Sequence, residues 1–513
     1  MLNLVRALSR VNVAVFFVVA SLSAQWSLSI AATKPNILMI VIDDLGWNDT
    51  SYKGSDIKTD FIDTLAVEGI RLQQYYVQRY CSPTRSAILA GRYPYHMGLA
   101  RAVIINGHPF GLPLNQTTIQ SATAIADELK KGGYSTHCVG KWDLGMHKWE
   151  YTPTYRGFDT FFGYYNAVED YYDHSFGNVG KIKFDGVDFR NNTKPVTDKN
   201  GTYSTMLFTE AVEQIIMNHN SDKGPFFIYA AYQSIHYPME APQKYIDECS
   251  YIPYDNRRIL CGMLRAADEG IANITARLKE RNFLDDTIII FTTDNGGQTM
   301  LGSSNLPLRG NKMTVFEGGV RGNAFVWGSK LPKLNYDNHQ LIHATDWLPT
   351  IVEGIAGLEL DKDKWALDGY NVWKTITNND ETPRKEVLIN LDPPTKGFRG
   401  QAAIRVGQWK LVTGLPNCSM TPLPGGHACP DGWIHLNGTI EPPPYTPSFT
   451  WLFNIEDDPN ERNNVADQHP EMVKQLKERI EFYNSTHIEQ LHPGLDPKSN
   501  PAKFGGVWTP WLD

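Results

Sequence analysis

Cysteine is scarce in this sequence. The 513 residues contain six cysteines, too few for a fold held together mainly by disulfides. Basic residues are also in deficit, with 48 Lys and Arg against 56 Asp and Glu and a formal net charge of −8. Because binding to a phosphate backbone requires a basic surface, nucleic acid is not an expected partner. Beyond the N-terminal region no run is long and apolar enough to span a membrane, so we expect no membrane span in the mature chain.

Residues 1–31 have the pattern of a secretory signal peptide. Arg6 and Arg10 precede the apolar stretch from Val11 to Leu22, and Ser29-Ile30-Ala31 supplies small residues for a cleavage site. A membrane anchor is the alternative, but the stretch is short for a spanning helix. We therefore expect a protein of the secretory pathway, in the lysosome or outside the cell. Candidate glycan sites are the eight Asn-x-Ser/Thr sequons at Asn48, Asn115, Asn191, Asn200, Asn273, Asn417, Asn437 and Asn484.

Four of the cysteines lie in two pairs that are close in sequence. Cys249 with Cys261, and Cys418 with Cys429, could each close a short disulfide loop, although sequence does not determine connectivity. Cys81 and Cys138 would then remain. Because an exposed thiol is easily oxidised in a secretory compartment, we expect Cys81 to be buried, bridged or chemically altered.

Strand-like and helix-like patterns alternate from Lys34 onwards. Apolar runs predict buried strands, at 36–42, 134–139, 225–230 and 287–292. Amphipathic segments predict helices, at 59–70, 123–131 and 263–282. This alternation predicts an α/β fold with a large, mainly parallel sheet between helical layers. We assign residues 34–385 to this catalytic domain.

The pattern changes near residue 386. The predicted elements beyond it are a hairpin, a further strand and an amphipathic helix, at 402–406 with 409–412, 451–454 and 470–483. The segment 416–447 is rich in Pro and Gly and is expected to be irregular. Residues 386–513 therefore predict a smaller C-terminal α+β subdomain, with an antiparallel sheet and a helix.

Acidic residues follow two of the predicted core strands. Asp43 and Asp44 come directly after 36–42, and Asp294 and Asn295 come after 287–292. Either pair alone could serve as helix caps or turn residues. Together, at equivalent strand ends where α/β proteins bind ligands, they favour a metal site. A set of oxygen ligands suits calcium or magnesium better than zinc.

One short motif is more specific than these patterns. Cys81-Ser82-Pro83-Thr84-Arg85 lies in an expected loop before a predicted helix at 86–91, and Leu89-Ala90-Gly91-Arg92 follows. Further motifs stand in order along the chain: Gly140-Lys141-Trp142, Ser234-Ile235-His236, Thr293 to Gly297, Leu308 to Lys312, Glu317 to Arg321, and Leu452-Phe453 with Asp458-Pro459. This ordered set resembles the type I sulfatases, and within them the arylsulfatase B type, over nearly the whole mature chain.

The resemblance implies an alkaline-phosphatase-like sulfatase fold and a set of site residues. It implies that Cys81 is oxidised to formylglycine (3-oxoalanine) by a formylglycine-generating enzyme during secretion. It implies one calcium ion per chain, bound by Asp43, Asp44, Asp294, Asn295 and the modified Cys81. It implies that Arg85 steadies the formylglycine hydrate, and that Lys141, His236 and Lys312 contact the sulfate ester. In this family one hydroxyl of the hydrate attacks sulfur, and loss of a proton from the other releases sulfate.

One position departs from the family pattern. Gly140-Lys141-Trp142 is followed by Asp143, where the family has the histidine that deprotonates the second hydroxyl. An aspartate can accept a proton, but it adds negative charge near an anionic substrate, and burial would raise its pKa. His147 could approach the same place if this stretch were helical.

The leading hypothesis is hydrolysis of a sulfate ester. The substrate would be a sulfated sugar such as N-acetylgalactosamine 4-sulfate, or a small aryl or dietary sulfate. One alternative is a formylglycine-dependent phosphonate or phosphodiester hydrolase. Another is a catalytically impaired binder of sulfated glycans, because Asp143 replaces the expected base. Retention of Cys81, Pro83 and Arg85, which maturation requires, favours an active enzyme.

Overall fold

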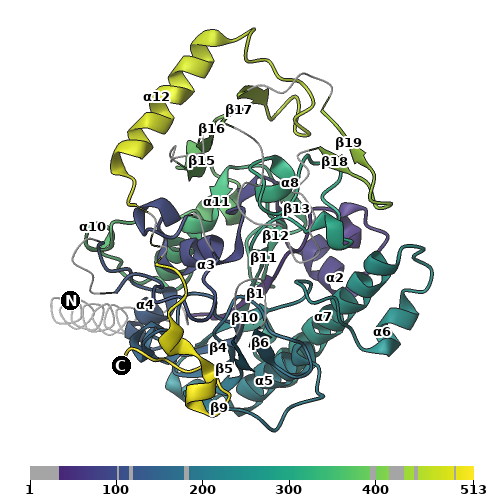
Figure 1. The fold of residues 1–513 in the computed structure, drawn as a ribbon, viewed down its shortest axis with the longest axis vertical. Coiled ribbons are helices and arrows are strands. Elements are labelled where there is room, and N and C mark those ends of the chain that lie inside the picture. Colours follow the sequence, from purple (N-terminus) through teal and green to yellow (C-terminus); the bar gives the residue numbers. More distant parts are fainter. Residues whose placement is uncertain are drawn as a thin grey trace, which may run out of the picture. The chain divides into compact units, whose positions relative to one another are not determined.

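In a computed structural model of the chain, the apolar run Asn36–Ile42 forms β1, a central strand of a ten-stranded sheet (Figure 1). All of its residues are buried, as expected for a strand that is covered on both faces. Parallel neighbours flank it on both sides, β10 (Phe226–Tyr232) and β11 (Thr287–Thr293). Next to β10, β4 (Ser135–Lys141) and β5 (Thr160–Tyr164) continue the parallel series. Five adjacent parallel strands therefore end at the same edge of the sheet.

Shorter strands complete the sheet at both sides. The strand order is β13-β2-β12-β11-β1-β10-β4-β5-β8-β9. β12 is antiparallel to β11 and β2, and β8 is antiparallel to β5 and β9. The sheet is thus mixed and mainly parallel at its centre, which confirms the predicted fold class. The bounds of these outer strands are β13 (Tyr336–Asn338), β2 (Ile70–Leu72), β12 (Ala324–Trp327), β8 (Arg190–Asn191) and β9 (Lys194–Pro195).

Side chains of β1 point alternately into two apolar cores, one on each face of the sheet. Its odd-numbered residues, from Ile37 to Val41, pack with residues of α3 and α4. Its even-numbered residues, from Leu38 to Ile42, pack with residues of α2, α5 and α7. This alternation is the pleat of a strand with helices on both sides. The helices are α2 (Asp60–Glu68), α3 (Cys81–Ala90), α4 (Ile125–Lys131), α5 (Ser204–Asn218) and α7 (Asp255–Glu280).

A second, antiparallel sheet is built from C-terminal residues in the order β15-β16-β17-β20. The helix α12 (Pro470–Thr486) contributes Leu476 and Tyr483 to a core that this sheet also lines. This arrangement confirms the predicted small sheet with one helix. Its strands are β15 (Glu386–Asp392), β16 (Gln401–Val406), β17 (Trp409–Gly414) and β20 (Thr450–Asn454). The domain boundary at residue 386 stays a prediction.

The structure describes residues 34–100, 103–114, 119–177, 184–392, 400–414, 432–443, 449–489, 491 and 493–513. The predicted signal peptide, Asn115, Asn417 and the Cys418 and Cys429 pair lie outside them. The remaining helices within them are α6 (Gln243–Glu248), α8 (Glu317–Val320), α9 (Trp347–Pro349), α10 (Lys362–Trp365) and α11 (Trp373–Asn378). The remaining strand pairs are β3 (Tyr75–Tyr76) with β14 (Ile342–His343), β6 (Ser175–Gly177) with β7 (Asp185–Val187), and β18 (Trp433–Ile434) with β19 (Ile440–Glu441).

Two helix predictions need correction. The stretch Cys81 to Arg85 is not a loop, because α3 begins at Cys81 itself. Pro83 fits there because it lies in the first helical turn, where its missing N–H has no intrahelical partner to lose. The helix predicted at 263–282 begins earlier, at Asp255. The helix α5 has no counterpart among the helices predicted from the sequence.

The predicted disulfide between Cys249 and Cys261 is present and joins the end of α6 to α7. Among the described residues, Cys81 and Cys138 are free and buried. Over the same residues, no helix is long and apolar enough to cross a membrane.

A buried ion cluster connects the C-terminal sheet to α8. Lys410 Nζ, from β17, lies 2.9 Å from Glu317 Oε1 and 2.8 Å from Glu461 Oε1, and all three side chains are fully buried. Burial raises the pKa of Glu461 to about 7, and Lys410 opposes that rise. The ammonium group therefore compensates two carboxylates that have no access to water.

We expect Lys410→Met to destabilise the protein by about 3–5 kcal/mol, because it removes the nearest cation from two buried carboxylates. Urea unfolding followed by fluorescence measures the loss. Lys385→Met is the matched control, since Lys385 pairs with Glu381 at an exposed position, and it should leave stability unchanged. Equal stability of the two variants would contradict the importance of the cluster.

Candidate active site

The carboxyl ends of four neighbouring parallel strands carry charged or polar residues. In strand order these are Asp294 and Asn295 after β11, Asp43 and Asp44 after β1, His236 beyond β10, and Lys141 with Asp143 at the end of β4. Because parallel strands end at the same edge, these side chains meet there, at the place where α/β sheets bind ligands.

The helix α3 brings Cys81 and Arg85 to the same edge. Cys81 is the first residue of the helix and is 1% exposed, and Arg85, one turn later, is fully buried. The two side chains lie on one face of the helix because they are four residues apart. Lys312 reaches the site from the segment between β11 and α8. The structure thus brings together the residues that the sequence analysis assigned to catalysis and metal binding.

Each cation in the site lies against a carboxylate. Lys141 Nζ is 2.5 Å from Asp43 Oδ2, and Lys312 Nζ is 2.6 Å from Asp44 Oδ1. Arg85 contacts Asp294 Oδ2 through Nη2 at 2.8 Å and through Nε at 3.0 Å. All of these side chains are at most 3% exposed.

The contacts of the two lysines keep these groups charged although they are buried. Burial alone would raise the pKa of Asp43 and Asp44, but the neighbouring cations, Lys141 first at Asp43 and Lys312 first at Asp44, together outweigh it and lower both values. Burial alone would lower the pKa of the two lysines, and the surrounding acidic groups, Asp43 first at Lys141 and Asp44 first at Lys312, together outweigh it and raise both. Burial, with the neighbouring Asp43, raises the pKa of Asp294. The site is therefore a network of paired charges.

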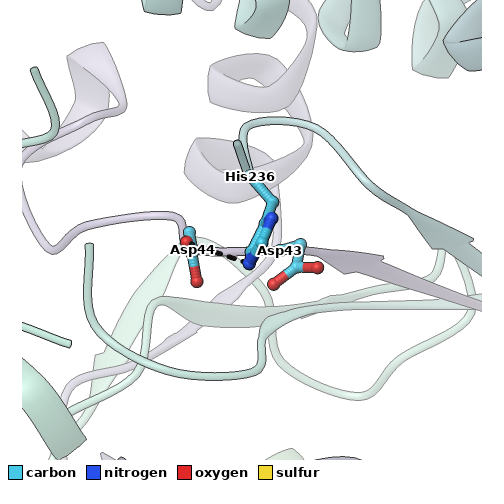
Figure 2. A group of neighbouring side chains, drawn as sticks. All are labelled: Asp43, Asp44 and His236. Atoms are coloured by element: carbon cyan, nitrogen blue, oxygen red, sulfur yellow. Dashed lines mark ion pairs between the residues drawn. The ribbon is translucent and has the colours of Figure 1, made fainter. Parts of the chain in front are cut away.

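Several acceptor oxygens in this network lack a donor. Asp43 Oδ1, Asp44 Oδ2 and Asn295 Oδ1 are buried, and none has a hydrogen-bond partner among the described residues. Asp43, Asp44 and His236 each offer a ligand atom, and these atoms lie within 4.8 Å of one another (Figure 2). Buried acceptors without donors are costly. A cation would compensate them, and oxygen donors suit a hard cation.

The His236 ring points toward the carboxylates of Asp43 and Asp44 (Figure 2). Its Nε2 lies 3.8 Å from Asp44 Oδ2, the contact drawn as a dashed line in Figure 2. Its Nδ1 lies 2.6 Å from the carbonyl oxygen of Tyr237, which favours the tautomer with the proton on Nδ1. Burial, with the nearby Lys312, lowers the pKa of His236. The imidazole is therefore neutral near pH 7, and its Nε2 faces the site.

Asp143 lies beside Cys81 and is fully buried. Its Oδ1 accepts a hydrogen bond from Ser82 Oγ at 2.6 Å. Its Oδ2 is 3.7 Å from Lys141 Nζ and has no hydrogen-bond partner in the part of the chain that the structure describes. Burial raises the pKa of Asp143. Burial, and next the Asp143 carboxylate, raise the pKa of the Cys81 thiol. Asp143 is thus a carboxyl group in contact with the predicted nucleophile.

His147 does not take the place of the missing histidine. Residues 142–147 are not helical, so the approach of His147 by one helical turn does not occur. Its ring packs instead against Tyr151, with centroids 4.1 Å apart, and against Trp511.

Three supporting residues were not identified from the sequence. Ser82 holds Asp143, as described above. Gln233 exchanges two hydrogen bonds of 2.8 Å with the backbone of Glu169. Tyr171 donates through its hydroxyl to the carbonyl of His236 at 2.9 Å. Only Ser82 lay within a recognised motif. Glutamine and tyrosine outside a motif carry no signal of their own.

Comparison with known proteins assigns the chain to a family. A family model described as Sulfatase matches residues 35–357, a span that contains every site residue named above. The chain belongs to the sulfatase family. Members of this family hydrolyse sulfate esters, so this sulfatase is a sulfuric ester hydrolase.

Named relatives agree with this assignment over most of their length. Arylsulfatase J of Mus musculus is 40% identical over 496 residues, covering 93% of this chain and 80% of the relative. N-acetylgalactosamine-6-sulfatase of Homo sapiens is 30% identical over 501 residues, covering 94% and 90% respectively. Arylsulfatase A of Homo sapiens is 29% identical over 479 residues, covering 87% of each.

Solved structures share the fold of this sulfatase. The crystal structure of Ps i-CgsB has a TM-score of 0.74 at 26% identity and covers 92% of this chain and 97% of that chain. A second structure of that protein, in complex with k-i-k-neocarrahexaose, has a TM-score of 0.73 and covers 89% and 94%. The predicted sulfatase fold is confirmed.

Proposed function

We propose that this sulfatase acts through a formylglycine formed from Cys81 and requires bound calcium. The observation that carries the proposal is the surroundings of residue 81. Three cations, four carboxylates and a neutral imidazole converge around the first turn of α3, and four buried oxygens there have no donor among the described residues. These are the groups that an anionic ester and a divalent cation need.

An unmodified Cys81 is poorly suited to chemistry in this site. A thiol attacks only as its thiolate, and both burial and Asp143 hold the thiol protonated by raising its pKa. Formylglycine avoids this difficulty because its hydrated aldehyde supplies a hydroxyl nucleophile. The motif Cys81-Ser82-Pro83-Thr84-Arg85 is the recognition sequence that a formylglycine-generating enzyme would use in the secretory pathway.

The charge balance supports a divalent cation. The site has a formal charge of −1 when every group is ionised, because four carboxylates face three cations. The carboxylates are Asp43, Asp44, Asp143 and Asp294, and the cations are Arg85, Lys141 and Lys312. That charge would repel a sulfate ester. Calcium held by the oxygens of Asp43, Asp44, Asp294 and Asn295, together with residue 81, would reverse it to +1 and polarise the ester.

The remaining residues supply binding and proton transfer. Lys141 and Lys312 would hold the anionic sulfate between them, and Arg85 would orient residue 81 and Asp294. The Lys312 ammonium would assist departure of the alkoxide, because negative charge develops on the leaving oxygen. His236 Nε2 faces the site and would share this role only when it carries a proton. Asp143, in contact with residue 81, would accept the proton that the family's histidine accepts.

The substrate we propose is a sulfate ester of a sugar, such as N-acetylgalactosamine 4-sulfate, or a small aryl or dietary sulfate. Support comes from the relatives, which include arylsulfatases and an N-acetylgalactosamine-6-sulfatase. A secreted or lysosomal location is supported by the Cys249–Cys261 disulfide. It is also supported by the exposure of the sequons at Asn191, Asn200, Asn273 and Asn437.

Asp143 favours one second candidate, a binder of sulfated glycans that turns over poorly. Burial raises the pKa of this carboxyl group, and a group that is ionised less often would be a slow proton acceptor. The two candidates differ in the rate of turnover.

We expect mass spectrometry of protein from a eukaryotic secretory host to find an aldehyde at position 81, and the same protein to hydrolyse an aryl sulfate. N-acetylgalactosamine 4-sulfate oligosaccharides, small plant sulfates and a phosphodiester complete the substrate panel. Cys81→Ala is the inactive control. An unmodified thiol in protein from that host would refute the proposal, and conversion with binding but no hydrolysis would identify the glycan binder.

We expect calcium to stabilise the protein and to be required for activity. A ligand at about 100 times its Kd stabilises the folded state by about 2.7 kcal/mol, so chelation should lower the Tm and re-addition of calcium should restore it. Asp44→Asn should weaken this calcium-dependent shift. Asp337→Asn is the control, because Asp337 pairs with Arg71 outside the site. If chelation changed neither the Tm nor the activity, the proposed calcium site would be wrong.

We expect Asp143→Asn to lower kcat by about 100-fold, because an amide cannot accept a proton in place of the carboxylate. Asp143→His should raise kcat above that of the natural protein by about 10-fold, since imidazole is the better base near neutral pH. Steady-state and burst kinetics with an aryl sulfate measure both effects. If the histidine variant were no faster, Asp143 would be an adapted base and not a handicap.

A further inference from the structure

Arg79, two residues before Cys81, contacts the segment that carries Lys312. Its carbonyl oxygen accepts a hydrogen bond from Met313 N at 2.9 Å. Its Nη1 donates to the carbonyl oxygen of Met313 at 3.3 Å. Arg79 therefore holds both backbone polar groups of the residue that directly follows Lys312.

The backbone around Lys312 needs such support. Met313 has a left-handed φ of 78°, a conformation that costs a non-glycine residue about 1–3 kcal/mol and persists only where its surroundings impose it. Lys312 N donates to the carbonyl of Gly297 at 3.1 Å, which anchors the segment on the side of β11. The contacts of Arg79 anchor it on the side of α3.

The guanidinium of Arg79 also reaches the C-terminal sheet. Its Nη2 lies 2.5 Å from Asp392 Oδ2, and its Nη1 donates to Gln401 Oε1 at 3.0 Å. Asp392 ends β15, Gln401 begins β16, and the two residues are paired in register. The side chains of Arg79 and Asp392 are 9% and 4% exposed. The ion pair is thus shielded from solvent, which strengthens it. Its Asp392 is held in place by the pairing of β15 with β16, so the connection is rigid.

We propose that Arg79 is a positioning residue that fixes Lys312 and the start of α3 against the β15–β16 edge of the C-terminal sheet. The inference rests on the role proposed above for Lys312 at the sulfate ester. Lys312 Nζ, held 2.6 Å from Asp44 Oδ1, is one end of a series of contacts that ends at Asp392. A displacement of about 1 Å in such a group can cost about 100-fold in rate. The C-terminal sheet thereby influences the reaction without contacting the substrate.

A purely structural role for the same ion pair makes different predictions. If Arg79 only stabilised the fold, its loss would lower the rate by the same factor whether Lys312 were present or not. If Arg79 acts through Lys312, its loss has little further effect once Lys312 is gone, because coupled residues are not additive.

The test is a double-mutant cycle of Arg79→Met and Lys312→Met, with kcat/KM for an aryl sulfate expressed per converted residue 81. We expect Arg79→Met to lower kcat/KM by about 10-fold in the natural background and by less than about 2-fold in the Lys312→Met background. Equal losses in the two backgrounds would overturn the inference.

A second variant keeps the inference testable if Lys312→Met is too slow to measure. Arg79→Met with Asp392→Leu replaces the buried pair by apolar side chains, which often restores stability. We expect its Tm to recover and its rate to stay low. A rate that recovers together with the Tm would show that Arg79 is only structural.

Two controls separate this inference from the proposed function. Arg71→Met removes an arginine whose Nε pairs with Asp337 at 2.6 Å in the strands β2 and β13, and it should leave the rate unchanged. Mass spectrometry of the peptide containing residue 81 reads the conversion of Cys81 independently of the cycle. An unconverted cysteine would refute the proposed function, whereas full conversion with additive rate losses would refute only the role of Arg79.

Discussion

Charge buried without water at one edge of the main sheet is the constraint on which the rest of this structure depends. Taking an ion out of water costs several kcal/mol even in a real protein, so each ion must lie against a partner. Three pairs meet that condition: Asp43 with Lys141, Asp44 with Lys312, and Asp294 with Arg85. The partners come from strand ends, a helix and a connecting segment. Their distances therefore hold only if the four parallel strands that carry the site and α3 are packed in register.

Much of the fold and of the site could be predicted because the decisive signals are local. Residues 37–42 are all apolar, which is typical of a strand that is covered on both faces. The site residues lie beside short motifs at strand ends. The start of α3 could not be predicted with the same rules, because Pro83 commonly signals a loop but is also tolerated in a first helical turn.

The parts that escaped prediction depend on contacts between distant residues. Arg79 and Asp392 are 313 positions apart, and nothing near either residue indicates the other. The same is true of Lys410 and its two glutamates. Tyr171 holds the carbonyl of His236 through a single hydrogen bond, and Gln233 is joined to the backbone of Glu169 by two. Such partners become visible only when the chain is folded, because any polar side chain of suitable length could have made the contact.

The burial of Cys81 sets an order of events. At 1% exposure, beneath the completed network of charges, its sulfur offers no access to another protein's active site. If formylglycine is formed by a separate enzyme, that enzyme must meet the chain before α3 packs against the sheet. Oxidation of the cysteine and folding then compete in time, and the faster process decides the fate of each molecule. A chain that folded too early would be stable and well packed, and permanently inert.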